Sequence, residues 1–509
     1  MSALALVAVL FGSFLLLLLV GAPIAAALGI ASLLSFLWLG EDPMKMVQIA
    51  FNSVGSFPLM ALPAFILAGA LMEAAGISRR LVAIAESFAG PISGGLAAAA
   101  ILACIFFGAI SGSGPATTAA VGMLMIPAMQ RRGYDGDYAS AVVASSGGLG
   151  IVIPPSIPMV IFGIAALGIA VPPAALEAHG AFQTVSIPKL FIAGVVPGLF
   201  LASALLLLNY LISRKRGYKG RTEGWSAGEV GRALRAGIWS IAAPLVILGG
   251  IYSGLFTPTE SAVVAIFYTL FVGLFIHGEM RLPDIQKAID STTLLSGRVL
   301  LILFSANLFG RLLVENRIPT MAADAILSVT TNLYAIWVIL LLFLLFIGMF
   351  METLAAILIL TPVLLPIAYG LGIDPVHFGV VMVCTLAIGF STPPLGENLF
   401  VASGISHASF EAVTRSALPF VMVFLLSVLV LAGLLAVGPA FASEKQAYVM
   451  EMSENWLIDG DLPAHVLVLS LQGLANRNGP KLYLEYGPSW PWKITKPLRD
   501  FYERKHDFV

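Results

Sequence analysis

Long apolar stretches separated by short polar segments dominate the hydrophobic pattern of this chain. Stretches such as 4–20, 190–211 and 420–437 contain almost no charged residue, and each is long enough to cross most or all of a bilayer core. A transmembrane β-barrel would instead show segments of about ten residues with alternating polarity. The pattern therefore predicts an all-α polytopic membrane protein, and we expect about ten spans with two re-entrant hairpins.

Composition supports this class of protein. Hydrophobic residues make up 59% of the 509 residues and charged residues only 11%, whereas soluble domains carry about 25% charged residues. Cys104 and Cys384 lie in apolar sequence, so neither a disulfide framework nor a metal cluster is indicated. The chain contains no Walker-type phosphate loop, so we expect no ATP, and we expect no nucleic acid as a partner.

Charge placement predicts the orientation in the membrane. The densest basic stretch is RKRGYKGR, residues 214–221, and basic loops face the cytoplasm. The basic loop at 131–132 then also faces the cytoplasm, while the loop 370–377, which lacks Lys and Arg, faces outward. We therefore expect a multi-pass protein of the bacterial inner membrane, with both termini periplasmic.

Two windows of the chain resemble each other at an offset of 239 residues. They cover residues 111–158 and 350–398, and their matched residues are Pro127 with Pro366, Gly133 with Gly372, Asp135 with Asp374, Gly150 with Gly389, and Pro154-Pro155 with Pro393-Pro394. The loops within the two windows are predicted on opposite sides of the membrane. Inverted repeats with Gly/Pro-interrupted helices indicate the central site of a secondary transporter.

Each repeat contains two breaks rich in Gly, Pro, Ser and Thr. In the first repeat these are SGSGPATTAA (111–120) and SSGGLGIVIPPSIP (145–158), and in the second they are residues 348–353 and GFSTPPLGEN (389–398). Non-helical backbone at membrane depth is tolerated only where protein or a water-filled cavity satisfies its polar groups. Carbonyl and hydroxyl oxygens suit Na⁺, and half-helix N-termini suit a carboxylate. Close helix packing is the alternative explanation for such small residues.

Four further polar residues lie within or near these spans. Glu352 and Glu397 each lie at a break, and Glu352 either belongs to the site or faces water at a hairpin mouth. Asn398 is a candidate ligand or backbone cap. Arg298 is a candidate partner for a substrate carboxylate, with a snorkelling or structural ion-pair role as the alternative.

Four motifs together resemble the large membrane subunit of the tripartite ATP-independent periplasmic (TRAP) transporters. They are LPAFILAGALM (62–72), GSGPATTAAVG (112–122), GIVIPPSIP (150–158) and STPPLGENLFVASG (391–404), and the resemblance covers roughly residues 1–440. It implies an elevator-type transporter coupled to Na⁺, with a small four-helix membrane subunit and a periplasmic substrate-binding protein as partners. It implies organic acids as substrates: C4-dicarboxylates, sialic acid, sugar acids or keto acids.

The resemblance also implies site residues at the level of motifs. Na⁺ would be held at two places, by Ser111, Gly112, Ser113, Gly114, Ser145 and Gly148, and by Gly348, Thr353, Thr392 and Gly396. Substrate would contact Thr117, Pro154, Pro155, Ser156, Pro393, Pro394, Asn398 and Arg298. No catalytic residue is expected.

These expectations divide the chain into six parts. Scaffold helices and an arm occupy 1–56, and transport repeat 1 occupies 57–171, with a hairpin at 94–130 and an unwound span at 137–171. Scaffold helices with the cytoplasmic loop 214–235 occupy 172–293. Transport repeat 2 occupies 294–410, with a hairpin at 333–370 and an unwound span at 376–404, and a last span follows at 411–440.

The sixth part, 441–509, is an extramembrane tail of different composition. HVLVLSLQGLANRNGPKLYLEY (465–486) predicts strand, short helix and strand, an α/β-like segment. It weakly resembles the N-terminal part of a secreted family of proposed glycoside hydrolases. A genuine fusion, a truncated larger protein and a joined gene product are the alternatives, and we favour an incomplete or artefactual extension. No acid/base pair is evident, so no catalysis is expected.

The sequence therefore favours Na⁺-coupled import of an organic acid delivered by a binding protein. A stand-alone ion-coupled carboxylate symporter or antiporter is the alternative. A membrane-embedded enzyme is disfavoured because His277, His377 and His407 are scattered.

Overall fold

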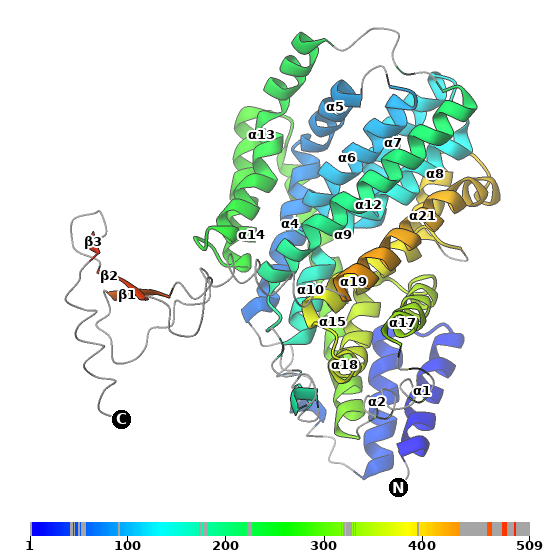
Figure 1. The fold of residues 1–509 in the computed structure, drawn as a ribbon, viewed down its shortest axis with the longest axis vertical. Helices are drawn as coiled ribbons and strands as arrows, with labels where there is room; N and C mark the ends of the chain where they lie inside the picture. The colour runs from blue at the N-terminus through cyan, green and yellow to red at the C-terminus, as the bar shows by residue number, and fades with distance from the viewer. Residues whose placement is uncertain are drawn as a thin grey trace. The chain divides into compact units, whose positions relative to one another are not determined.

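The computed structural model describes residues 3–40, 57–89, 92–167, 184–218, 226–316, 332–393 and 396–436, some positions between these ranges, and three short strands between 466 and 494. It forms two compact units, Met1–Gly433 and Leu434–Val509. The described part of the first unit is helical throughout (Figure 1).

The helices of the first unit follow one another in this order. The first part contains α1 (Ala3–Leu19), α2 (Ile24–Leu39), the 3-10 turn η1 (Phe57–Met60), α4 (Ala61–Ala74), α5 (Ile77–Ala89), α6 (Gly95–Ser111), α7 (Gly114–Arg131), α8 (Gly136–Gly147), α9 (Leu149–Val152) and α10 (Ile157–Ala166). The second part contains α12 (Ile187–Arg216), α13 (Ala227–Tyr252), α14 (Pro258–Phe271), the π-helical turn η2 (Val272–Ile276), α15 (Leu282–Glu315), α17 (Leu333–Gly348), α18 (Thr353–Gly370), α19 (Pro375–Gly389), α20 (Glu397–Ser406) and α21 (Phe410–Ala436).

Helix boundaries recur at the offset seen in the sequence. α7 and α18 begin 239 residues apart, at Gly114 and Thr353, and both are 18 residues long. The turns that follow them contain Gly133 and Gly372 at φ +83° and +71°, a left-handed backbone that glycine adopts without steric cost. The two segments thus share their local design, and their inverted orientation stays a prediction.

Membrane-spanning character is clear for much of this unit. Six of the described helices are long and apolar enough to cross a membrane, and eight candidates result if two bent helix pairs each count as one span. Five shorter apolar helices accompany them. The chain is therefore a multi-pass membrane protein, while the count of ten spans remains a prediction.

Burial separates inner helices from lipid-facing ones. In the most apolar window of α18, 78% of the residues are buried, compared with 33% in α13. Exposed apolar side chains on α13 and α14, such as Leu245 and Phe267, suit contact with lipid tails. The breaks rich in Gly, Pro, Ser and Thr lie on the buried helices.

Two charged amphipathic segments are parts of longer helices. Residues 228–235 form the first turns of α13, and residues 282–288 form the first turns of α15. No residue that breaks a helix separates these charged turns from the apolar turns that follow. A further amphipathic segment, residues 79–88, lies in α5, which bends by 69° from α4.

The corner between α4 and α5 is held by polar contacts. Glu279 pairs with Arg80 (Nη2–Oε1, 2.9 Å) and with Arg79 (Nη2–Oε2, 3.4 Å). His277 contacts the Ala75 carbonyl through Nδ1 at 2.8 Å. Burial lowers the pKa of His277. The neutral imidazole therefore donates its Nδ1–H to this carbonyl at pH 7.

The second unit contains a small antiparallel sheet in the order β1-β2-β3, with β1 (Val466–Ser470), β2 (Lys481–Glu485) and β3 (Lys493–Ile494). Val466 pairs with Glu485 and Ser470 with Lys481. Both strands predicted from the sequence are present, and the segment between them, where we predicted a helix, lies outside the described residues.

Candidate functional site

The first hairpin tip is a compact cluster of oxygen atoms. α6 ends at Ser111, Gly112 turns the chain at φ +59°, and α7 begins at Gly114. The Ser111 and Thr117 hydroxyl oxygens lie 2.9 Å apart, and Thr117 Oγ1 donates to the Ser113 carbonyl at 2.7 Å. The tip thus gathers two hydroxyls and a carbonyl, from Ser111 and Ser113, which we assigned to Na⁺, and from Thr117, which we assigned to substrate.

The second break of the first repeat lies against this tip. α9 ends at Val152 and α10 begins at Ile157, and the two sides are bent by 42°. Between them the peptide bond Pro154-Pro155 is cis, and Ser156 Oγ accepts a hydrogen bond from the Met159 N–H. A Cβ built on Gly112 would lie 2.9 Å from the Ile157 nitrogen, so the two breaks are in close contact.

Each repeat contains a crossing of two glycine backbones beside its breaks. A Cβ on Gly108 of α6 would overlap the backbone of Gly150 on α9. In the second repeat a Cβ on Gly389 of α19 would overlap the backbone of Gly348 on α17. A flexible side chain could move aside to make room for an added Cβ, but these backbone atoms cannot. These positions therefore require glycine.

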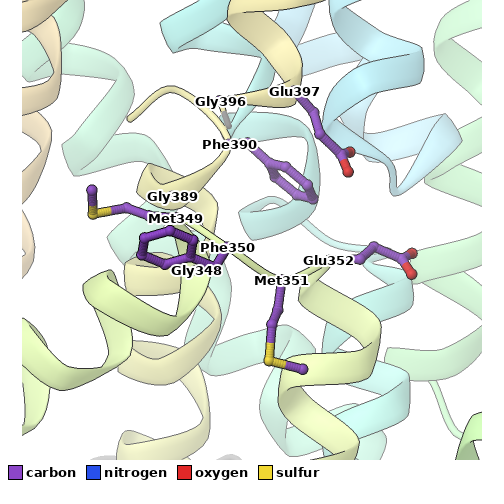
Figure 2. Close-up of a pocket in the computed structure, with 9 residues that line it drawn as sticks. All are labelled: Gly348, Met349, Phe350, Met351, Glu352, Gly389, Phe390, Gly396 and Glu397. Atoms are coloured by element: carbon purple, nitrogen blue, oxygen red, sulfur yellow. The ribbon is translucent and has the colours of Figure 1, made fainter. Parts of the chain in front are cut away.

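A small pocket lies at the second repeat's breaks (Figure 2). Its volume is about 20 Å³, and it is lined by Gly348, Met349, Phe350, Met351, Glu352, Gly389, Phe390, Gly396 and Glu397. Such a volume admits a single water-sized occupant. Gly348 and Gly396, both predicted site residues, therefore meet at one cavity that connects the tip before α18 with the break before α20.

Three charged residues lie near this pocket. Figure 2 shows the side chains of Glu352 and Glu397 extending to the same side of the pocket, away from Met349 and Phe350. Glu352 interacts electrostatically with both Glu397 and Arg298. Arg298 itself is exposed on α15. Arg298 is thus within electrostatic range of Glu352, and its role, as partner of a substrate carboxylate or as part of an ion pair, stays a prediction.

Contacts between Asn398 and the end of α8 join the two repeats. Asn398 Nδ2 donates to the Ala144 carbonyl at 3.0 Å, and Ser391 Oγ donates to the same carbonyl at 2.9 Å. Asn398 is fully buried. A Cβ on Gly148 would lie 3.0 Å from the Ala387 carbonyl of α19. The break at 145–158 and the break at 389–398 therefore lie close together in the protein interior.

The first turn of α20 offers few free amide groups to an anion. The Asn398 N–H donates to Phe390, and the N–H groups of Leu399 and Phe400 both donate to Gly396. Most N–H groups at the N-terminus of α20 therefore already have hydrogen-bond acceptors within the protein, and few remain to bind the carboxylate that we considered there. α7 and α18 begin at the two hairpin tips, where the first helical hydrogen bonds come from Thr117 and Ala356.

The remaining predicted site residues keep their local positions. Thr353 begins α18 and is buried, and Thr392 Oγ1 donates to the Ile388 carbonyl at 2.8 Å. Pro393 follows Thr392 in the break before α20, and Pro394 lies outside the described residues. Ser145 is 2% exposed, at the end of α8.

Three polar residues at this junction were not among the predicted ligands. Thr118 and Ser146 are fully buried beside Thr117 and Ser145, and Ser391 reaches the Ala144 carbonyl. Each directly follows or precedes a residue that we did select. The signal was therefore present in the motif, but residue type alone does not reveal which neighbour faces inward.

The donor set fits a monovalent cation. Buried oxygens of Thr118, Ser145, Ser146 and Asn398 have no hydrogen-bond partner among the described residues. Unsatisfied buried oxygens cost free energy unless a ligand or water meets them. Neutral carbonyl and hydroxyl oxygens of this kind coordinate Na⁺ at unwound helices of secondary transporters.

The chain is similar to known proteins over most of its length. The family model of the DctM component of the tripartite ATP-independent periplasmic transporter matches residues 11–437, and a model described as the GxGYxYP_N first domain matches residues 429–508. The isethionate TRAP transporter permease protein DctMQ of Oleidesulfovibrio alaskensis is 44% identical over 435 residues, which cover 85% of this chain and 66% of that protein. The C4-dicarboxylate TRAP transporter large permease protein DctM of Pseudomonas aeruginosa is 39% identical, with 81% and 93% covered.

The fold is also similar to a solved structure. The YdaH transporter of Alcanivorax borkumensis superposes with a TM-score of 0.56 at 15% sequence identity, covering 76% of this chain and 87% of that one. At this identity the likeness concerns the fold alone.

Proposed function

The chain belongs to the DctM family, the large permease component of the tripartite ATP-independent periplasmic transporters, and from this membership we propose that it imports an organic acid by Na⁺-coupled secondary transport. It is a transporter permease rather than an enzyme. The substrate would be delivered by a periplasmic binding protein, and a small four-helix membrane subunit would complete the transporter.

One observation carries this proposal. Oxygen-rich breaks from two segments of similar design, 239 residues apart in sequence, meet in the buried interior, where Asn398 contacts Ala144. A secondary transporter binds its substrate and coupling ion at such a junction, close to the middle of the membrane. The junction supports Na⁺ as the coupling ion because its oxygens belong to neutral groups.

Movement of the junction would follow an elevator mechanism. The breaks lie on inner helices, while α13 and α14 present apolar side chains to lipid. We expect the inner body, which contains the breaks of both repeats, to slide against a scaffold of outer helices. The two repeats would have opposite orientations, as the loop charges predict.

The names of the relatives indicate the substrate class. The relatives are named for isethionate and for C4-dicarboxylates, so small organic acids are the class to test first. The hairpin tips at the N-termini of α7 and α18 favour an anionic group, since the first turns of these helices have amides without helical partners.

Uptake into proteoliposomes tests the proposal. The vesicles would contain this chain with a small subunit, and a binding protein and a labelled organic acid would be added outside. We expect uptake only when an inward Na⁺ gradient and the binding protein are both present. Uptake that needs Na⁺ but not the binding protein would instead support the stand-alone symporter, and uptake without Na⁺ would contradict the coupling.

A further inference from the structure

Two arginines and a tryptophan form an exposed stripe along the first turns of α13. Arg232, Arg235 and Trp239 are all exposed, and they follow one another at intervals of one helical turn. Successive helical residues point about 100° apart, so the three side chains lie within roughly 60° of one another around the helix. The charged start of α13 thus presents two guanidinium groups and an indole on one face, just before the apolar turns of the span.

The neighbouring helix α14 packs antiparallel to α13 (Figure 1). Tyr268 Oη donates to the Trp239 carbonyl at 2.7 Å, and Ser261 Oγ donates to the Ile247 carbonyl at 2.8 Å. Because the contact of the later residue on α14 is with the earlier residue on α13, the two helices run in opposite directions. These two contacts also determine which turns of α13 and α14 lie at the same depth in the membrane.

Two phenylalanines extend the stripe onto this neighbour. Phe271 and Phe275 are exposed, and their ring centroids lie 5.7 Å apart. The turns that follow the contact with Trp239 on α14 and η2 lie beside the turns that precede Trp239 on α13. Phe271 and Phe275 are therefore at about the depth of Arg235 and Arg232.

The guanidinium groups of the stripe differ from those of the neighbouring helix α5, which packs against α13. On α5, Arg79 and Arg80 both pair with Glu279. Arg232 and Arg235 form no ion pair with a carboxylate in the described part of the chain, and both side chains are exposed. Their positive charges are therefore open to an anion from outside the protein.

The chemistry of this surface selects an anionic phospholipid. Guanidinium groups bind phosphate oxygens through paired N–H groups, and the cytoplasmic leaflet, which we predict to lie at this end of α13, is rich in anionic lipids. Tryptophan lies preferentially at the level of the headgroups. A soluble anion would use only the arginines, whereas a lipid would also use Trp239 and the apolar surface of the two phenylalanines.

We propose that α13 and α14 bind an anionic phospholipid at the cytoplasmic boundary of the membrane. Its phosphate would lie on Arg232 and Arg235, its headgroup region beside Trp239, and its acyl chains along Phe271 and Phe275. The bound lipid would hold these outer helices at a fixed depth in the membrane. This inference goes beyond the proposed transport function and is independent of the coupling ion.

Replacing both arginines by glutamine tests this surface, because glutamine keeps a polar side chain and removes the charge. Arg132→Gln/Arg415→Gln is the matched control, since both residues are exposed and Arg415 has the same place in α21 as Arg232 in α13, counted from the first residue. The measurement is the rise in Tm of the purified full chain in detergent on addition of phosphatidylglycerol. The parent and the control should show this rise, and Arg232→Gln/Arg235→Gln should lose at least half of it.

Three comparisons can overturn the proposal. Arg232→Lys/Arg235→Lys keeps the charge and should retain most of the rise, and an unchanged rise in the glutamine variant would show that this surface is not the site. An equal rise with phosphatidylcholine or with inorganic phosphate would exclude an anionic lipid as the ligand. If the glutamine variant keeps the response to phosphatidylglycerol but no longer copurifies with a small membrane subunit, the surface binds that subunit instead.

Discussion

Neighbouring residues of one type have different roles at this junction. Thr117 donates its hydroxyl to Ser113, whereas the hydroxyl of Thr118 has no partner in the described part of the chain. Successive helical residues point about 100° apart, so one member of a pair can face its own helix while the other faces a neighbour. The motif TT therefore predicted an oxygen-rich tip, but it did not predict which hydroxyl is available.

The glycine crossing at Gly348 and Gly389 leads to a prediction at the residue scale. Gly389→Ala would force a Cβ into the Gly348 backbone and should destabilise the protein by about 1–3 kcal/mol, the usual cost of overpacking. The measurement is Tm in detergent, together with the yield of folded protein.

Gly404→Ala is the control for this prediction. It lies inside α20 and has no neighbouring atom within 4 Å of a built Cβ. Alanine is favoured over glycine in a helix by about 0.5–1 kcal/mol, so this variant should be neutral or slightly stabilised. Equal effects of the two substitutions would show that the crossing does not constrain the fold.

At the scale of elements, α12 is fastened to the first repeat near its C-terminal end. Tyr138 of α8 donates to Asn209 Oδ1 at 2.9 Å, and Asn209 Nδ2 donates to the Gly94 carbonyl at 3.2 Å. Tyr218 donates to Asp135 at 2.6 Å, and Arg216 pairs with the same carboxylate. These contacts fasten the C-terminal end of α12 to the first repeat, and the assignment of residues 172–293 to the scaffold stays a prediction.

Tyr138→Phe tests how much this fastening contributes. Removing the hydroxyl deletes its bond to Asn209 Oδ1 and its longer contact with Ser213 Oγ (3.3 Å), and should lower the free energy of unfolding by about 1 kcal/mol. Tyr210→Phe is a control on α12 itself, because Tyr210 is 38% exposed. The measurement is the Tm of the two variants in the same detergent, and it should fall only for Tyr138→Phe. An equal fall in both variants would contradict a stabilising role for the contacts between α12 and the first repeat.

At the scale of the whole molecule, the chain contains two units that match two different family models. The helical unit spans Met1–Gly433 and the DctM match spans 11–437, whereas the GxGYxYP_N match covers 429–508. Helices with apolar surfaces are stable in a bilayer without any contribution from a polar sheet.

Truncation after residue 440 follows as a prediction from this division. The shortened chain should insert, keep the parent's Tm and support uptake at an unchanged rate, because the helices that the structure describes precede the cut. Uptake in proteoliposomes with matched protein amounts checks it. Loss of uptake with normal insertion would show that the tail takes part in transport.

Much of the architecture was determined by the sequence alone, because its signals are local. Hydrophobic length predicts the membrane helices, and Gly, Pro and hydroxyl residues predict where helices stop, as at Gly112 and between Val152 and Ile157. The 239-residue offset was likewise readable, because a repeated pattern requires no knowledge of contacts. The family also followed from these motifs, since they occur together and in order.

Only the tertiary structure decided which of these breaks meet. Asn398 and Ala144 are 254 positions apart, and their contact depends on how α8 and α20 pack against each other. The same packing places Glu352 beside Glu397 and leaves the Thr118 hydroxyl without a partner among the described residues. Hydrophobic patterning specifies that a helix is buried, but the facing partner of each polar atom depends on rotation and crossing of whole helices.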